Sequence, residues 1–460
     1  MSTEPVLGQG KISSWLSKQG IVPSIKWGYL AVLVFMVGDG IELGFLAVFL
    51  EDRGFTGTNV ATLISVYGVV VAAAAWLSGA LSEAWGPRKV MLYGFGIWAV
   101  FEVIFLLAIV AETFPIMLLA YGIRGFGYPF FAYGFLVWVT MVTPKPVIGR
   151  AVGWYWFFNV AGIGVVSAYF AGIVIPMVGQ FATMWLSLMF VVAGGLIAIF
   201  LLKDPQTGRT EKMSPADNLK SMARGLTIVK THPKIGIGGI VRLINTASFY
   251  AFPVFLSTHM VNEVGFSVTQ WQTIWGTLMF ANILGNIISG YLGDKIGHVN
   301  VIAWIGGLGC AIMILAFYYI PYFYGANFLL TMVVAGLLGL GIAAYCPLSA
   351  VVPLLAPKHA AAAVAILNLG AGLSNAAGPL LVRGFGGVLD TEGLMIMFAG
   401  LHGVGVLLTF LLRDETNPER AHDSEAFAIK GTDDELGKER TTVAATKEAP
   451  SSSKEQTGYA

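Results

Sequence analysis

The chain has 460 residues, of which 56% are hydrophobic and only 12% are charged. Soluble domains carry about 25% charged residues, so this composition excludes a soluble protein and indicates an integral membrane protein with the lipid bilayer as its solvent. The formal net charge of +1 argues against a nucleic-acid partner, and the two cysteines, both inside apolar runs, predict neither a disulfide framework nor a metal site. We expect no cofactor.

Windows of about 20 mainly apolar residues predict twelve membrane spans. Their expected limits are 27–50, 60–82, 89–110, 114–141, 151–174, 183–202, 235–259, 270–291, 299–320, 326–350, 361–383 and 393–412. The pattern predicts an all-α membrane protein of two six-helix halves, 27–202 and 235–412. A polar segment (1–26) precedes them, a long polar loop (203–234) joins them, and a tail (413–460) rich in Ser, Thr, Glu and Lys is expected to be largely disordered.

Basic residues set the expected orientation. With the N-terminus inside, the cytoplasmic segments ahead of the tail hold sixteen Lys and Arg residues, whereas the outer loops hold only Arg53 and Arg383. Cytoplasmic loops of membrane proteins carry an excess of Lys and Arg. Both termini are therefore predicted to be cytoplasmic, which agrees with an even number of spans. The polar, basic start of the chain predicts no signal peptide.

Charged residues lie inside several of these apolar spans. The first span reads "FMVGDGIELGFLAVFL" and carries Asp39 and Glu42, and three more ionisable side chains lie in later spans: Glu102, Arg124 and Arg242. A charge at the centre of a membrane helix costs ~2.5–3.5 kcal/mol, so most of these groups must face partners or water inside the bundle. We expect Glu102 to be the buried partner of an arginine, and Arg242 to pair with an acid or to extend toward the interface.

Asp39 and Arg124 both fall near the midplane when each span is measured at about 1.5 Å per residue. A buried acid beside an arginine is held ionised, and it favours the protonated form when the arginine moves away. Such a pair predicts a proton switch, with a structural ion pair as the alternative. Glu42 lies three residues from Asp39 on the same helical face, so either acid is a candidate proton carrier.

The chain repeats itself after its second and eighth spans. The stretch "GALSEAWGPRK" (79–89) follows one and "GYLGDKIG" (290–297) follows the other, and their glycines suit tight turns. At an offset of 211 residues the copies align as Gly79 with Gly290, Glu83 with Asp294 and Gly86 with Gly297. The two halves are therefore predicted to be pseudo-symmetric copies of one unit. Such repeats are typical of secondary transporters, whose substrate sites lie near the midplane between the halves.

The second copy matches Gly-x-x-x-Asp-Lys-x-Gly, the signature of the major facilitator superfamily, and residues 27–412 resemble that superfamily. The first copy departs from the signature, because Glu83 replaces the aspartate and Ala84 the basic residue. Within the superfamily the chain resembles the bacterial polyol permeases, which take up ribitol and D-arabinitol. The likeness lies in the acid-bearing first span, in "YGIRGFGYPFFAYGF" of the fourth and in "GWYWFFN" of the fifth.

The resemblance implies a proton symporter that imports a small polyol by alternating access, as a monomer in the bacterial cytoplasmic (inner) membrane. In proton-linked sugar carriers of the superfamily an acid of the first span and an arginine of the neighbouring fourth span couple the proton, and Asp39 and Arg124 match them by position. The resemblance also implies that the cytoplasmic loops latch an inner gate. These gating residues are Gly79, Glu83, Gly86, Arg88, Gly290, Asp294, Lys295 and Gly297.

A polyol offers hydroxyl groups and CH faces, so its site needs amide or carboxylate groups beside aromatic walls. The candidates are Glu42, Trp154, Asn159, Asn245, Tyr250, Asn282, Asn286, Asn368 and Asn375. For any single asparagine, a hydrogen bond to a neighbouring helix is the competing interpretation. Three intramembrane acids for two arginines favour a neutral substrate, with an organic-anion exchanger and an uncoupled facilitator as alternatives. An enzyme is not expected, because HExxH, GxSxG and clustered His and Cys are absent from the sequence.

Overall fold

The structure is a computed structural model that describes residues 16, 19–144, 147–202, 227–356 and 360–413, without the side chains of 80, 83, 148, 149, 294 and 360–362. The chain divides into two units, Met1–Leu412 and Arg413–Ala460. All of the second unit but Arg413 lies outside the described residues, as do residues 203–226 of the expected central loop. The fold below is that of the first unit.

Six spans make up the first half. They consist of α2 (Lys26–Gly40) with α3 (Leu46–Asp52); α4 (Gly57–Trp85); α5 (Pro87–Val110); α6 (Phe114–Arg124) with the π-helical η2 (Pro129–Tyr133) and α7 (Gly134–Val142); α8 (Ile148–Val160) with the π-helical η4 (Ala161–Val166) and α9 (Ser167–Val178); and α10 (Gln180–Phe200). A 3-10 turn, η1 (Pro23–Ile25), precedes α2.

The second half follows the short helix α12 (Ile228–Thr231). Its spans are α13 (Pro233–Thr258) with the π-helical η5 (His259–Glu263); α14 (Val268–Ile296); α15 (His298–Asn300) with the π-helical η6 (Val301–Gly309) and α16 (Cys310–Tyr324); α17 (Phe328–Ala343) with α18 (Leu348–Leu354); α19 (Ala360–Phe385); and α20 (Thr391–Phe410). The described residues form no β-strand.

Ten stretches of the described chain are long and apolar enough to cross a membrane. The two other expected spans are helical but fail one condition each. Span 27–50 is interrupted between α2 and α3, so neither piece is long enough, and span 270–291 lies in the continuous helix α14, whose many Thr, Gln and Asn residues lower its hydropathy. The architecture is thus the expected all-α membrane bundle of two six-helix halves.

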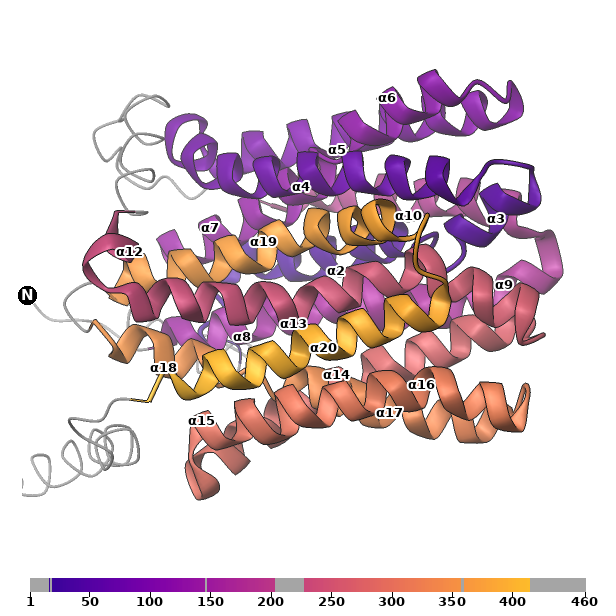
Figure 1. Ribbon diagram of the computed structural model, residues 1–460. Helices are drawn as coiled ribbons and strands as arrows, with labels where there is room; N and C mark the ends of the chain where they lie inside the picture. The colour runs from indigo at the N-terminus through magenta and orange to yellow at the C-terminus, as the bar shows by residue number, and fades with distance from the viewer. Residues whose placement is uncertain (1–15, 17–18, 145–146, 203–226, 357–359, 414–460) are drawn as a thin grey trace, which may run out of the picture. The chain divides into compact units, whose positions relative to one another are not determined.

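The helices of the unit run side by side (Figure 1), and the packing within each half repeats in the other. The first span packs against the sixth through α2 and α10, and the seventh packs against the twelfth through α13 and α20. The halves meet along two related seams. One joins α4 to α19, and the other joins α9 and η4 to α14. A path between the halves is therefore bounded by the second, fifth, eighth and eleventh spans.

The repeated loops adopt the same backbone geometry at one glycine of each copy. Gly86 has φ 92° and Gly297 has φ 91°, in the left-handed region that favours glycine, and each caps the preceding helix. Gly79 and Gly290 do not lie in turns as expected, because α4 and α14 continue through them to Trp85 and Ile296. We call this end of the bundle the basic end, which the sequence predicts to be cytoplasmic, and the other the opposite end.

Two basic residues of the predicted gating set contact their own half. Arg88 donates through Nη2 to the carbonyl oxygen of Ile199 at 2.7 Å, which ties the start of α5 to the end of α10. Lys295 Nζ lies 4.5 Å from the ring centre of Tyr291. The side chains of Glu83 and Asp294 lie outside the described residues, so the gating role of these loops stays a prediction.

Candidate functional site

The first span breaks where it carries its acids. Helix α2 ends at Gly40 and α3 begins at Leu46, with residues 41–45 in turns. Asp39 lies in the last turn of α2, and Glu42 lies in the break itself. Gly40 permits a close approach to the fifth span, because a Cβ there would lie 2.2 Å from the carbonyl oxygen of Ile163. Broken helices near the midplane are where secondary transporters hold substrates and coupling ions.

The fourth span breaks at its arginine. Helix α6 ends at Arg124, a turn follows at Gly125 and Phe126, and the π-helical η2 begins at Pro129. The sequence "RGFGYP" explains the break, since glycine costs helix stability and proline lacks the N–H of a helical hydrogen bond. π-helical turns inside α-helices accompany functional sites in many proteins. The breaks of the first and fourth spans face each other and bring their charges together.

Arg124 binds two carboxylates. Its Nη2 donates to Oε1 of Glu42 in the first span, and its Nη1 donates to Oε2 of Glu102 in the third. All three side chains are buried, with exposed fractions of 1% or less. The guanidinium carbon also lies 4.3 Å from the ring centre of Tyr121 and 4.8 Å from that of Trp98. The expectation that Glu102 is the buried partner of an arginine is confirmed.

Asp39 does not pair with Arg124, which corrects the pairing inferred from position. Its Oδ1 instead accepts hydrogen bonds from Nε1 of Trp98 at 2.6 Å and from the hydroxyl of Tyr67 at 3.4 Å. The physical reason is the helix break: Glu42 in the turn reaches the guanidinium, whereas Asp39, still in α2, faces the second and third spans. Asp39 therefore lies beside the ion-paired group but outside it.

The four charged groups are unbalanced. Asp39, Glu42 and Glu102 offer three carboxyl groups, and Arg124 supplies the single positive charge among them. An ion buried without a partner costs several kcal/mol, so protons are the available countercharge. Oε2 of Glu42 and Oε1 of Glu102 have no hydrogen-bond partner, which leaves oxygen atoms free to take a proton. We call these four residues the charge cluster; chemically it can hold and release protons.

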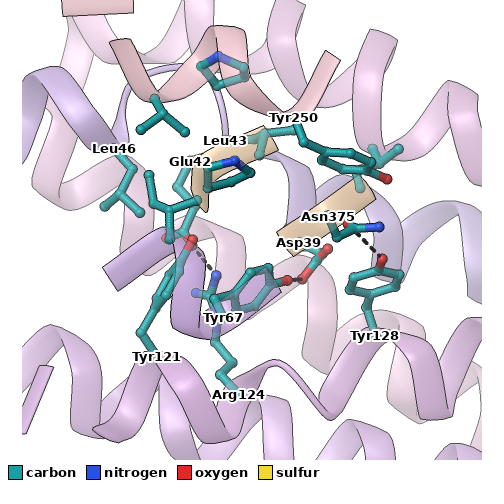
Figure 2. Close-up of a pocket in the computed structure, with 15 residues that line it drawn as sticks. Asp39, Glu42, Leu43, Leu46, Tyr67, Tyr121, Arg124, Tyr128, Tyr250 and Asn375 are labelled. Atoms are coloured by element: carbon teal, nitrogen blue, oxygen red, sulfur yellow. Dashed lines mark hydrogen bonds and ion pairs between the residues drawn. The ribbon is translucent and has the colours of Figure 1, made fainter. Parts of the chain in front are cut away.

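A pocket adjoins the charge cluster between the two halves (Figure 2). Figure 2 shows Glu42, Arg124 and Tyr67 on one side of it and Tyr128, Tyr250 and Asn375 on the other. Its lining residues are Asp39, Glu42, Leu43, Leu46, Ile64, Tyr67, Tyr121, Arg124, Tyr128, Ile163, Tyr250, Pro253, Val254, Asn375 and Pro379. The wall is therefore aromatic and hydroxyl-rich.

The two halves touch at the wall of the pocket, and the space inside the pocket is small. The hydroxyl of Tyr128 donates to Oδ1 of Asn375 at 3.4 Å across the interface between the halves. The pocket volume is about 40 Å³, which is room for about three water molecules. A five-carbon solute needs more space, so the halves must separate to admit it.

Three of the nine predicted substrate residues line this pocket: Glu42, Tyr250 and Asn375. The other six do not line it: Trp154, Asn159, Asn245, Asn282, Asn286 and Asn368. Several of these make the interhelical or local contacts of the competing interpretation. Nδ2 of Asn282 donates to the carbonyl oxygen of Gly339 at 3.3 Å, and Nδ2 of Asn159 donates to the hydroxyl of Tyr155 at 3.4 Å. Asn282 thus joins the eighth span to the tenth, whereas Asn159 contacts a residue of its own helix.

The sequence reasoning missed the tyrosines of the first half. Tyr67, Tyr121 and Tyr128 line the pocket, and Trp98 holds Asp39. A signal for two of them exists: Tyr121 precedes Arg124 by three residues and Tyr128 follows it by four, which is the spacing of one helical face. Applying helical periodicity around the buried arginine would have found both.

Arg242, the second intramembrane arginine, lies on α13 and has no carboxylate partner. No ion pair joins its guanidinium to an acid of the described chain within 4.0 Å, and its electrostatic neighbours are Cys346, Tyr250 and Tyr133. These come from the tenth, seventh and fourth spans, so Arg242 faces the interface between the halves. The expectation that it pairs with an acid is not met.

The two helix halves are pseudo-symmetric, and helices break at their centre. A buried charge cluster lies there beside a pocket between the halves. This arrangement defines a secondary transporter rather than an enzyme. The model of the Major Facilitator Superfamily matches residues 28–241 and 238–453. The chain belongs to the major facilitator superfamily.

Curated relatives of the chain are named transporters. The chain is 40% identical over 413 residues to "Alpha-ketoglutarate permease" of Bacillus subtilis (strain 168), covering 90% of this chain and 94% of the relative. It is 37% identical to "D-arabinitol transporter" of Klebsiella pneumoniae, covering 87% and 94%. It is also 37% identical to "Ribitol transporter" of the same organism, covering 86% and 93%. The expected likeness to polyol permeases is confirmed.

Solved structures share the fold. The nucleoside transporter NupG aligns with a TM-score of 0.66 at 14% identity over 85% of this chain and 99% of that one. At this identity the likeness shows the fold alone.

Proposed function

We propose that the protein is a proton symporter that imports a small polyol of the ribitol or D-arabinitol type across a bacterial cytoplasmic membrane by alternating access. The observation that carries the proposal is the charge cluster, in which two buried carboxyl groups bind one guanidinium and a third lies beside them at the wall of a pocket between the halves. Such a cluster needs a proton as countercharge. Relatives named for ribitol and D-arabinitol support the polyol.

The pocket's chemistry suits hydroxylated solutes. Four tyrosine hydroxyls (Tyr67, Tyr121, Tyr128 and Tyr250) and the amide of Asn375 line it. A hydroxyl and an amide both donate and accept hydrogen bonds, as polyol hydroxyls do, and the tyrosine rings supply flat apolar walls for CH groups. Orientation of a substrate would then follow from which of these groups its hydroxyls meet.

Proton binding is coupled to substrate binding because Glu42 and Asp39 belong to the charge cluster and also line the pocket. Protonation of Glu42 weakens its pair with Arg124, while Glu102 keeps the guanidinium in place. Because Glu42 lies in the break of the first span, loss of that pair allows α2 and α3 to move relative to the fourth span. Proton binding and substrate access are thereby linked through one helix break, and linkage of this kind is what symport requires.

Uptake into proteoliposomes tests this proposal. With an inward gradient of one pH unit, radiolabelled ribitol or D-arabinitol should accumulate up to about tenfold, because tenfold equals ~1.4 kcal/mol. Without a gradient, both should only equilibrate. If uptake is equally fast but never exceeds equilibrium under any gradient, the protein is a facilitator and the proton part of the proposal fails.

A second candidate substrate is an organic anion, which the 40% identical relative named "Alpha-ketoglutarate permease" favours. The same assay with radiolabelled 2-oxoglutarate in place of the polyols tests it. Exclusive uptake of the acid would replace the polyol in the proposal and leave its proton coupling to be judged from the gradient.

Alternating access is supported by where the halves touch. Trp271 donates through Nε1 to the carbonyl oxygen of Gly44 at 2.7 Å, and Arg383 donates through Nε to Thr62 Oγ1 at 2.9 Å. The hydroxyls of Tyr169 and Thr277 lie 3.2 Å apart. These bonds join the halves between the pocket and the opposite end. The described conformation therefore has its predicted outer side closed.

Gly68→Ala should shift the conformational equilibrium toward an outward-open state. A Cβ at Gly68 would lie 2.1 Å from the carbonyl oxygen of Asn375 on the facing helix, so the closed seam becomes overpacked. Overpacking costs about 1–3 kcal/mol, which shifts the population ratio about fivefold or more. The cost disappears when the halves separate.

Spin labels at Thr58→Cys and Val388→Cys, in a background with both native cysteines replaced by serine, report the separation of the halves at the opposite end. We expect a longer label-to-label distance to gain population in Gly68→Ala. Gly96→Ala is the matched control, because a Cβ there meets no atom within 4 Å. Identical distance distributions in the Gly68→Ala variant and wild type would contradict the rocking of these seams.

A further inference from the structure

Arg242 is a cation without a counterion on the substrate path. Of the two arginines deep within the described spans, Arg124 is bound by two carboxylates, whereas Arg242 has none within 4.0 Å. It is partly exposed, and it makes no side-chain hydrogen bond within the described residues. An unpaired charge inside a membrane protein is costly and marks a substrate or ion pathway by default. A bound anion would offset that cost.

Arg242 extends the pocket toward the basic end. Tyr250 is both a wall of the pocket and an electrostatic neighbour of Arg242. The two lie eight residues apart on α13, about 12 Å along the helix axis. Tyr133 of the first half is a further neighbour. Arg242 therefore lies at the interface between the halves, on the basic-end side of the pocket.

The combination of groups specifies a chemical class. The pocket offers hydroxyl and amide partners for several hydroxyl groups of a solute. The unpaired guanidinium of Arg242 lies beyond these partners, toward the basic end. Guanidinium binds carboxylate through two parallel hydrogen bonds, which gives both strength and orientation. Arg124 differs from Arg242 because it already binds two carboxylates, those of Glu42 and Glu102. Within the described spans, a free cation beside several hydroxyl partners matches a solute with one carboxylate and several hydroxyls.

We propose that Arg242 is a carboxylate-binding group of the carrier, and that small polyhydroxy monocarboxylates such as the five-carbon aldonates are substrates. The inference rests on the proposed proton-coupled carrier. It widens the substrates from polyols to the related acids, in which a carboxylate replaces one terminal CH2OH group of the polyol. The hydroxylated end lies against the tyrosines and Asn375, and the carboxylate lies on Arg242.

Charge transfer distinguishes the two kinds of substrate. One proton entering with a neutral polyol moves a net positive charge, so its uptake responds to membrane potential. One proton entering with a monoanion moves no net charge, so its uptake follows the pH gradient alone. Moving one elementary charge is worth ~2.3 kcal/mol per 100 mV, which is about a fiftyfold difference in accumulation.

The experiment compares ribitol with D-ribonate, which share a carbon skeleton, in proteoliposomes of the full chain. For wild type we expect ribonate to inhibit ribitol uptake competitively and to accumulate under a pH gradient but not under a potassium-diffusion potential. In Arg242→Gln the apparent affinity for ribonate should fall about 10- to 150-fold, equivalent to ~1.5–3 kcal/mol for a hydrogen bond to a charged group. Affinity for ribitol should change less than about threefold.

Two further variants keep the test decisive. Arg242→Lys retains the charge without the fork and should keep part of the ribonate affinity. Arg53→Gln removes the same charge from an exposed residue near the opposite end, where the guanidinium lies over Phe49 and Phe181, and should leave both substrates unaffected. If Arg242→Gln misfolds, the competition between ribonate and ribitol for uptake by the wild type still tests the inference, because it needs no variant.

The outcomes separate the two proposals. If wild type transports ribitol but ribonate neither competes nor accumulates, the carboxylate inference is overturned and the proposed function stands. Equal losses of ribitol and ribonate affinity in Arg242→Gln would assign Arg242 a structural role and also overturn the inference. If neither compound is transported, the proposed function fails, and the inference fails with it.

Discussion

Arg124→Gln should abolish transport and destabilise the protein. Arg124 is the single positive charge among three buried carboxyl groups, and it binds Glu42 and Glu102 directly. Removing one partner of a buried ion pair costs about 3–5 kcal/mol, because the other charge is left uncompensated. The variant should therefore melt at a clearly lower temperature in detergent and show no gradient-driven uptake in proteoliposomes.

A neutral triple variant separates the role in stability from the role in transport. In Arg124→Gln with Glu42→Gln and Glu102→Gln, the three ion-paired residues carry no charge and Asp39 keeps its bonds to Trp98 and Tyr67, so most of the lost thermal stability should return. Transport should not return, because the pair of Arg124 with Glu42, whose breaking the proposal requires, is gone. Arg53→Gln is the control for loss of an exposed arginine. Full transport by the triple variant would exclude the ion pairs of Arg124 from the coupling of proton to substrate.

Asp39→Asn should uncouple transport from the proton gradient. The change is nearly isosteric and keeps the oxygen that accepts from Trp98 and Tyr67, but it removes one of the two first-span acids that can ionise at the pocket. Accumulation under a gradient of one pH unit should fall from up to about tenfold to equilibrium. Exchange of labelled for unlabelled polyol, which needs no net proton movement, should continue.

Comparison with Glu42→Gln identifies the proton carrier. Asp39 lies in the pocket outside the ion-paired group, whereas Glu42 is a partner of Arg124, so the two substitutions disturb different contacts. Asp52→Asn, at the end of α3, is the matched control and should leave coupling intact. Accumulation that survives in Asp39→Asn and disappears in Glu42→Gln would transfer the coupling role to Glu42 and show that Asp39 only shapes the pocket.

The charge cluster explains why a hydrophobic span tolerates two acids. Residues of three spans form it. Glu42 lies in a turn of the first span and Arg124 at a helix end of the fourth, and Asp39 of the first span contacts Trp98 of the third. The cost of burying each charge is offset by a partner on another span. In the proposed mechanism the same breaks allow the pairs to change, so stability and movement would depend on one set of residues.

Much of the fold could be read from local sequence. A span is a run of apolar residues of fixed length, and the expected spans coincide with helical stretches of the described chain apart from breaks such as those in the first and fourth. The agreement arises because the requirement to satisfy the backbone in lipid is local. The copies at 79–89 and 290–297 predicted the pseudo-symmetry, and the matching φ angles of Gly86 and Gly297 reflect it. The charged residues of the spans likewise indicated where the charge cluster lies.

The partners of those charges were decided by the tertiary structure. Helical rise alone placed Asp39 and Arg124 at one depth, but the breaks at 41–45 and 125–126 rotate the side chains, so that Glu42 meets Arg124 and Asp39 meets Trp98. The asparagines were expected in the site from composition, and the structure places only Asn375 of them in the wall of the pocket. Which residues of a span face one another depends on the rotation and close approach of helices distant in sequence, and these are properties of the assembled bundle.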